Sequence, residues 1–240
     1  MPDRYYIETP IRESQATLAG SEAHHLLHVM RAKTGLKVIV FDGLGGEFDA
    51  TVVHCGRTEV QLEVGPRKEI ERELPYKLTL AVALPKGDRQ RWLVEKLVEL
   101  GVTRFIPLKT IRSAAGAEQS SKLARYVVSA SKQCGRNRLM QIEPSTSWVE
   151  FLKQPIATRQ LLAHPQGHPL PDFGQQPQTD IGLAIGPEGG FTEDEVDSAI
   201  AVGWEKVSLG RRILRIETAA LAMASAIVLG SNHSDEVAGS

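Results

Sequence analysis

The chain of 240 residues has only two cysteines, Cys55 and Cys134, and no C-x-x-C spacing joins them. This pattern favours reduced thiols over a disulfide framework or a cysteine-ligated metal. The N-terminus lacks a basic segment followed by an apolar one, so no secretory signal is predicted. The longest apolar run, 219–229 interrupted by Ser225, is too short to span a bilayer. We therefore expect a globular cytoplasmic protein without a membrane segment.

Two common nucleotide motifs, G-x-x-x-x-G-K-[ST] and G-x-G-x-x-G, are absent from the most glycine-rich stretch, residues 181–195. An apolar run of strand length, 181–185, is followed by glycines at 186, 189 and 190. Thr192 and Glu195 then form a capping-box pattern, which predicts the start of a helix. The carboxylates at 188 and 193–195 would repel a phosphate at that helix start. The loop therefore suits a neutral or cationic ligand, although an ordinary strand-to-helix connection can have the same glycines.

Net charge is also small, at −1 for the whole chain, which is unusual for a protein that binds nucleic acid. The charges are unevenly distributed, however, because residues 86–138 contain 12 Lys and Arg but only 4 Asp and Glu. A local basic face of this kind could neutralise several phosphates. A solvated helix face without a partner is the alternative interpretation.

Residues 1–75 have the pattern of a small β-rich module. A helix is predicted over 22–31 with Ser21 as its N-cap, followed by strands at 36–41, 47–54 and 58–64. Glycine-containing turns separate these strands. The expected architecture is a compact barrel.

Strands and helices alternate along residues 76–230. Strands are predicted at 77–84, 103–108, 160–163, 181–185 and 206–209, and helices at 91–100, 119–134 and 217–229. This alternation predicts a parallel αβα sheet, in which ligands bind at the carboxyl ends of the strands. The glycine-rich loops after 185 and 209 should meet there, together with residues 162–165.

Two motifs resemble a known family when they are taken together. They are Ile-Gly-Pro-Glu-Gly-Gly-Phe at 185–191 and Leu-Gly-x-x-Ile-Leu-Arg-x-Glu-Thr-Ala at 209–219. They resemble the SPOUT-class methyltransferases, and more closely the RsmE family, the ribosomal RNA small subunit methyltransferase E enzymes. The segment 24–31 also resembles that family's N-terminal pattern, His-His-Leu-x-x-Val-x-Arg. One departure is Lys132, where the family often has an acidic residue.

The resemblance implies a fold and an activity. It implies a PUA-like β-barrel that binds RNA (1–74), a SPOUT domain with a C-terminal trefoil knot (75–230) and a disordered tail (231–240). The implied reaction is methylation of N3 of one uridine in 16S ribosomal RNA with S-adenosylmethionine. The implied partners are the small ribosomal subunit and a second copy of the chain, with no metal and no membrane. A sulfonium cofactor agrees with the acidic loop.

The same resemblance assigns site residues. The implied cofactor-binding residues are Leu162, His164, Ile185, Gly186, Pro187, Glu188, Gly189, Gly190, Leu209, Gly210, Ile213, Leu214, Arg215, Thr218 and Ala219. The candidates for RNA binding are Arg4, Arg12, Arg31, Lys86, Arg89, Arg91, Arg136, Arg138 and Arg211.

The chemistry suggests three catalytic candidates. A cation near the uracil oxygens would favour loss of the N3 proton, and Arg215 is the first candidate for that cation, with Arg136 second. Glu217 could act as a base, or it could be a structural residue at a helix start.

Other functions remain open at this point. The chain could be a SPOUT methyltransferase of another RNA specificity, or a non-catalytic RNA-binding protein. His24 and His28 lie four apart, as zinc ligands do, but the Glu of H-E-x-x-H is missing and a third ligand is not evident.

Overall fold

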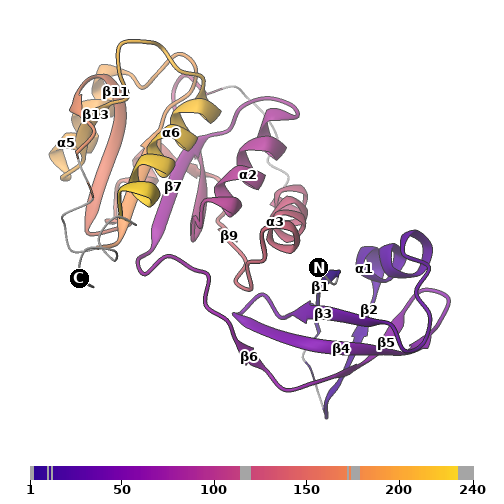
Figure 1. The fold of residues 1–240 in the computed structure, drawn as a ribbon. Helices are drawn as coiled ribbons and strands as arrows, with labels where there is room; N and C mark the ends of the chain where they lie inside the picture. The colour runs from indigo at the N-terminus through magenta and orange to yellow at the C-terminus, as the bar shows by residue number, and fades with distance from the viewer. Residues whose placement is uncertain are drawn as a thin grey trace, which may run out of the picture. The chain divides into compact units, whose positions relative to one another are not determined.

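The computed structural model describes residues 3–9, 11, 13–113, 120–171, 173 and 179–231. The chain divides into two compact units (Figure 1). The first consists of residues 1–73 with 128–139, and the second of residues 74–127 with 140–240. No helix in the described ranges is long and apolar enough to cross a membrane.

The first unit is a β-rich half-barrel. Its sheet has the order β1-β3-β4-β5-β2, and β6 pairs with β4. The strands are β1 (Arg4–Tyr6), β2 (Gln15–Leu18), β3 (Lys37–Phe41), β4 (Gly46–Cys55), β5 (Val60–Val64) and β6 (Lys68–Glu69). β1 and β3 pair in parallel, whereas β3–β4, β4–β5, β2–β5 and β4–β6 are antiparallel pairs. Alternate residues of β2 and β5 are buried in one apolar core, which confirms the predicted β-rich module.

The helical segment of this unit differs from the prediction. α1 (Gly20–His24) begins after Ala19, which is the N-cap, and no side chain caps it. Gly20 has a φ of +56°, a conformation that lets the chain enter the helix before Ser21. The helix continues as a π-helical turn, η1 (His25–Val29). The prediction of Ser21 as N-cap is therefore wrong.

The second unit is a parallel sheet with the order β10-β8-β7-β12-β11-β13, with β9 beside β8. Its strands are β7 (Leu78–Ala83), β8 (Arg104–Lys109), β9 (Gln141–Ile142), β10 (Thr146–Ser147), β11 (Arg159–Pro169), β12 (Ile181–Ile185) and β13 (Glu205–Ser208). Its helices are α2 (Arg89–Glu99), the first half of α3 (Ser120–Cys134), α4 (Trp148–Phe151), α5 (Glu193–Ala201) and α6 (Ile216–Ser231). This arrangement confirms the predicted parallel α/β sheet.

Helices cover both faces of this sheet. On one face, α6 packs against β7, β12 and α2. Figure 1 shows α6 beside α2 and β7. On the other face, Trp148 of α4 and Val196 of α5 share a core with Ala81 and Ala184. The small alanines of β7 and β12 face this second core, so the alternating larger residues of β7 point toward α6.

The strand predicted at 160–163 is longer in the structure. β11 leaves β13 after Ala163, and its pairing resumes at His168 opposite Val207. A Cβ on Gly167 would lie 2.5 Å from the Val207 backbone, so only glycine permits this close approach. Residues 164–167 therefore form an irregularity within a strand that continues beyond the predicted end at 163.

Candidate active site

The loop that follows β12 is compact. The N–H of Gly190 donates to the carbonyl of Pro187 at 2.8 Å, which closes a tight turn, and Gly190 has a φ of +69°. Phe191 folds its ring back over Gly186, where a Cβ would lie 2.9 Å from that ring. Two of the three glycines in this loop are therefore required by its shape, one for close approach and one for its left-handed backbone.

Three neighbouring groups hold this loop in place. The Arg112 guanidinium donates to the carbonyls of Gly189 at 2.7 Å and Phe191 at 3.4 Å. Thr192 and Glu195 form the predicted capping box, which is confirmed. The Glu195 carboxylate also accepts from the backbone N–H of Ile111 at 2.8 Å. The loop after β8 and the loop after β12 are thus fastened to each other.

Arg112 and the second contact of Glu195 were not predicted. Capping boxes are local patterns, but the partner of Arg112 lies 77 residues away in the sequence. One signal could have indicated Arg112: it follows the carboxyl end of β8, in the same parallel sheet as β12.

The loop that follows β13 presents a run of exposed side chains. Gly210 has a φ of +104°, and its N–H donates to the Ser208 hydroxyl at 3.3 Å. Arg211, Arg212 and Arg215 are exposed, and Ile213 is 92% exposed. Within the part of the chain that the structure describes, none of these three arginines has an ion-pair partner. Their positive charge is therefore available to an anionic partner.

A carboxylate lies at the start of α6. Glu217 is 6% exposed, and its Oε2 has no hydrogen-bond partner among the described residues. Its Oε1 lies 3.6 Å from Nη1 of Arg89. Nη2 of Arg89 donates to Oε1 of Glu188 at 3.2 Å. Arg89, predicted to bind RNA, is thus engaged by two carboxylates, one from each predicted cofactor-binding motif.

The remaining predicted cofactor residues fall into two groups. Ile185, Pro187 and Ala219 are buried, and Leu162 is fully buried in the core that contains Trp148, so its side chain packs against protein. Thr218 is exposed, whereas Leu209 and Leu214 are half-buried.

His164 lies in the irregular part of β11. Its Nδ1 accepts from the N–H of Gln166 at 3.2 Å. Burial, and secondly the charge of Lys206, lower the pKa of His164 below its ordinary value. The ring is therefore neutral at physiological pH, so it adds no positive charge to this edge.

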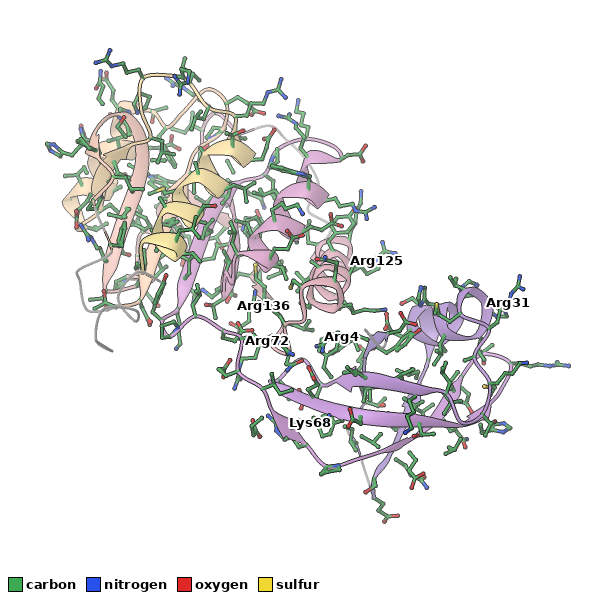
Figure 2. All side chains as sticks on the ribbon, in the orientation of Figure 1. Arg4, Arg31, Lys68, Arg72, Arg125 and Arg136 are labelled. Atoms are coloured by element: carbon green, nitrogen blue, oxygen red, sulfur yellow. The ribbon has the colours of Figure 1, made fainter. Side chains whose placement is uncertain are left out.

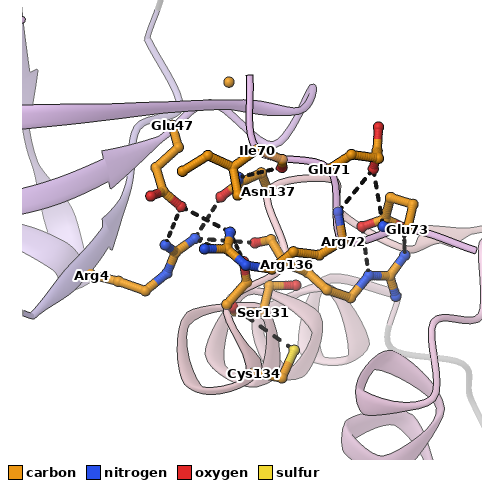
Figure 3. Close-up of polar contacts among 12 residues, drawn as sticks. Arg4, Glu47, Ile70, Glu71, Arg72, Glu73, Ser131, Cys134, Arg136 and Asn137 are labelled. Carbon is orange, nitrogen blue, oxygen red and sulfur yellow. Dashed lines mark hydrogen bonds and ion pairs between the residues drawn. The ribbon is translucent and has the colours of Figure 1, made fainter. Parts of the chain in front are cut away.

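Arg136 and Arg4 belong to a polar network within the first unit (Figure 3). Arg136 is 4% exposed, and its Nε and Nη2 both donate to the carboxylate of Glu73. Arg4 donates to Glu47 at 2.5 Å and to Oδ1 of Asn137 at 2.6 Å. These two arginines, predicted to contact RNA, instead bind protein groups, and the network fastens residues 135–137 to the sheet.

Glu47 is the buried carboxylate of this network, and Arg72 is its second partner at 3.0 Å. Burial alone would raise the pKa of Glu47, but hydrogen bonds and charge from Arg4 and Arg72 hold it below its ordinary value. Glu47 is therefore ionised at neutral pH.

The other predicted RNA-binding residues are distributed over both units. Arg31 is exposed just after the helical segment of the first unit (Figure 2), with a φ of +53°. Arg138 is exposed, with its guanidinium over Gly45. Lys86 is exposed in the second unit, whereas Arg91 pairs with Glu95 at 2.7 Å. Arg12 and residues 232–240 lie outside the described residues.

His24 and His28 lie with their ring centroids 4.7 Å apart. Among the residues described, no group of three or more His, Cys, Asp or Glu side chains could hold a metal.

Comparisons with known proteins agree with this geometry. A family model described as an RNA methyltransferase domain matches residues 72–228, and one described as an RNA methyltransferase PUA domain matches residues 18–65. The chain is 34% identical to the ribosomal RNA small subunit methyltransferase E of Synechocystis, over 91% of this chain and 75% of that protein. It is 28% identical to the enzyme of the same name from Bacillus subtilis, over 93% of this chain and 95% of that protein.

Solved structures are similar as well. The ribosomal RNA small subunit methyltransferase E of Neisseria gonorrhoeae, bound to S-adenosylmethionine, superposes with a TM-score of 0.86 at 30% identity, over 95% of this chain and 97% of that one. A methyltransferase from Legionella pneumophila, also bound to S-adenosylmethionine, gives a TM-score of 0.87 at 29% identity with the same coverage. By its sequence motifs, its fold and these similarities, the chain belongs to the ribosomal RNA small subunit methyltransferase E family.

Proposed function

We propose that this protein transfers a methyl group from S-adenosylmethionine to N3 of one uridine in 16S ribosomal RNA. The observation that carries the proposal is the composition of one sheet edge. There, the acidic, glycine-containing loop after β12 and the arginine-rich loop after β13 follow strands of the same parallel sheet. An acidic side suits a cationic cofactor, and an arginine-rich side suits RNA.

The residues of this edge fit the cofactor. Among the described residues, the buried Oε2 of Glu217 has no hydrogen-bond partner, and burying such an oxygen is unfavourable unless a ligand donates a hydrogen bond to it. Glu188 supplies a second negative charge near Glu217, because both carboxylates contact Arg89. Gly190 and Gly210 leave the backbone open, because no described residue other than their chain neighbours has an atom within 4 Å of where their Cβ atoms would be. Backbone groups of 185–190 and 209–215 would hold the adenosine and methionine parts.

S-adenosylmethionine supplies an activated methyl group on a sulfonium, so the protein mainly has to align donor and acceptor. Uracil N3 becomes a good nucleophile only when its proton leaves. Arg215, exposed directly before α6, is our candidate for the cation that stabilises the resulting negative charge. We assign Glu217 to cofactor binding, because Arg89 already holds it as an ion pair.

For Arg136 we propose a structural role, because its guanidinium is buried against Glu73. RNA contacts in the first unit then fall to Arg31 and Arg138, which are both exposed. The target base is paired or stacked in folded RNA, so we expect it to be extruded before methylation.

The wider assignments are part of the same proposal. Residues 1–74 would serve as the PUA-like RNA-binding module and 75–230 as the SPOUT domain, with a trefoil knot near the C-terminus. The protein would act on the small ribosomal subunit, because the relatives' names indicate a small-subunit RNA substrate. We propose in addition that it is a cytoplasmic homodimer.

Methyl transfer from labelled S-adenosylmethionine to small subunits purified from cells that lack the modification tests this function. N3-methyluridine at a single position, identified by mass spectrometry, is the expected product. A different methylated nucleoside would support RNA methyl transfer but contradict N3 of uridine as the target atom. Cofactor binding without any transfer, to small subunits or to their assembly precursors, would favour a non-catalytic RNA-binding protein.

A further inference from the structure

We infer that Arg89 is a positioning residue of the methyl-transfer site, because its guanidinium bridges Glu188 of the loop after β12 and Glu217 at the start of α6. This inference rests on the proposed function. It assigns to Arg89 a role toward the cofactor site in place of the RNA contact that the sequence predicted.

The geometry of the bridge uses both ends of one planar group. Nη2 of Arg89 is 3.2 Å from Oε1 of Glu188, and Nη1 is 3.6 Å from Oε1 of Glu217. Because the guanidinium presents its donors in a rigid fork, one side chain can hold two carboxylates at fixed positions. A lysine, with a single charged nitrogen, would share one point charge between them.

Burial differs strongly between the two carboxylates. The side chain of Glu188 is 54% exposed, whereas that of Glu217 is 8% exposed. An exposed ion pair contributes little to stability, but removing the cation that pairs with a buried carboxylate is strongly destabilising. Among the described residues, Arg89 is the one cation within ion-pair distance of Glu217. The contact with Glu217 is therefore the energetically important half of the bridge.

Arg89 is also poorly suited to its position in the helix. It is the first residue of α2, whose first turn has no acidic residue and whose N-cap, Asp88, does not cap the helix with a side-chain hydrogen bond. A cation at a helix N-terminus is unfavourable, because the positive end of the helix dipole lies there. Local conflicts of this kind are typical of functional positions. The two carboxylates explain why the conflict is tolerated.

The free oxygen of Glu217 connects this bridge to the cofactor. Arg89 approaches Oε1 and leaves Oε2, which has no partner within the described chain. The bridge thus orients a carboxylate with one oxygen held by protein and one available. Loss of Arg89 would release the carboxylates of Glu217 and Glu188, so cofactor affinity should fall.

The test compares Arg89→Ala and Arg89→Lys with Lys96→Ala. Lys96 is a matched control, because it lies on the same helix, is 38% exposed against 37% for Arg89, and pairs with Glu99 on the protein surface. We expect Arg89→Ala to raise KM for S-adenosylmethionine about tenfold, a loss between that expected for an exposed ion pair and that expected for a buried one. We expect kcat to stay within about threefold of the wild-type value. Arg89→Lys should restore part of the loss, and Lys96→Ala should resemble the unmodified protein.

A second pair of variants tests the bridge when Arg89→Ala does not fold. Glu188→Gln changes an exposed side chain and should raise the same KM by a smaller factor. In the double variant Arg89→Lys with Glu188→Gln, KM should rise by less than the product of the two single increases, because both substitutions weaken the same Arg89–Glu188 contact.

The outcomes separate this inference from the proposed function. An unchanged KM for S-adenosylmethionine in Arg89→Ala, or a loss confined to RNA affinity, would overturn the inference while the function stands. If the unmodified protein transfers no methyl group, the function fails. Calorimetric Kd values for S-adenosylmethionine with the same variants then decide the inference, and equal values would reject it.

Discussion

The contact between Gly186 and Phe191 leads to a quantitative prediction for Gly186→Ala. The new Cβ would lie 2.9 and 3.0 Å from two ring atoms of Phe191, closer than carbon atoms pack. The ring has little room to move, because it is 6% exposed and its centroid is 4.5 Å from that of Trp148. We therefore expect the loop after β12 to shift.

The size of the effect follows from overpacking of a well-packed site. Inserting one methyl group into such a site costs about 1–3 kcal/mol. If the shift is incompatible with bound cofactor, the same energy weakens binding of S-adenosylmethionine by about 5- to 150-fold. The free energy of unfolding of the second unit should fall by no more than about 3 kcal/mol, so the variant should fold.

Isothermal titration calorimetry with S-adenosylmethionine measures this effect directly. Phe191→Leu and the double variant Gly186→Ala with Phe191→Leu complete a mutant cycle. Leucine at position 191 has no ring and should relieve the contact with the new Cβ. The double variant should therefore bind S-adenosylmethionine more tightly than the sum of the two single losses of binding free energy predicts. Wild-type affinity in Gly186→Ala, or strict additivity in the cycle, would refute the steric reasoning.

Three further predictions concern charged residues. Glu47→Gln should destabilise the first unit by about 3 kcal/mol in urea unfolding at pH 7, because Arg4 and Arg72 lose their buried partner. The pKa of Glu47 is lowered in the folded state, so the wild-type advantage exists above the ordinary glutamate pKa and should shrink as pH falls through the folded-state value. Arg215→Ala should reduce kcat by more than it reduces affinity for S-adenosylmethionine, and equal kcat would reject Arg215 as the stabilising cation. Arg138→Ala should weaken RNA binding and lower the salt slope by about 1, and an unchanged slope would place Arg138 outside the RNA contact.

Periodic patterns in the sequence predicted the fold well. The parallel sheet, the strand at 181–185 and the capping box of Thr192 and Glu195 all depend on local spacing, which the sequence displays directly. The longer β11 was missed because Pro165 and Gly167 usually indicate a loop. Here the glycine instead allows the strand to rejoin β13.

The partners of charged residues were much harder to predict. Arg136 and Arg89 both lie in the basic segment 86–138, and the sequence assigned both to RNA. In the structure each is paired with carboxylates that are distant in the sequence. Composition reports how many charges a segment has, but tertiary contacts decide which of them are neutralised within the protein.

Hydrogen–deuterium exchange of the full chain, with and without S-adenosylmethionine, tests the position of the cofactor most directly. We expect increased protection of the backbone amides in 186–190, other than Pro187, and in 209–219, with little change in β3 and β4 of the first unit. Protection that is absent from both loops, while calorimetry shows that the cofactor binds, would contradict it.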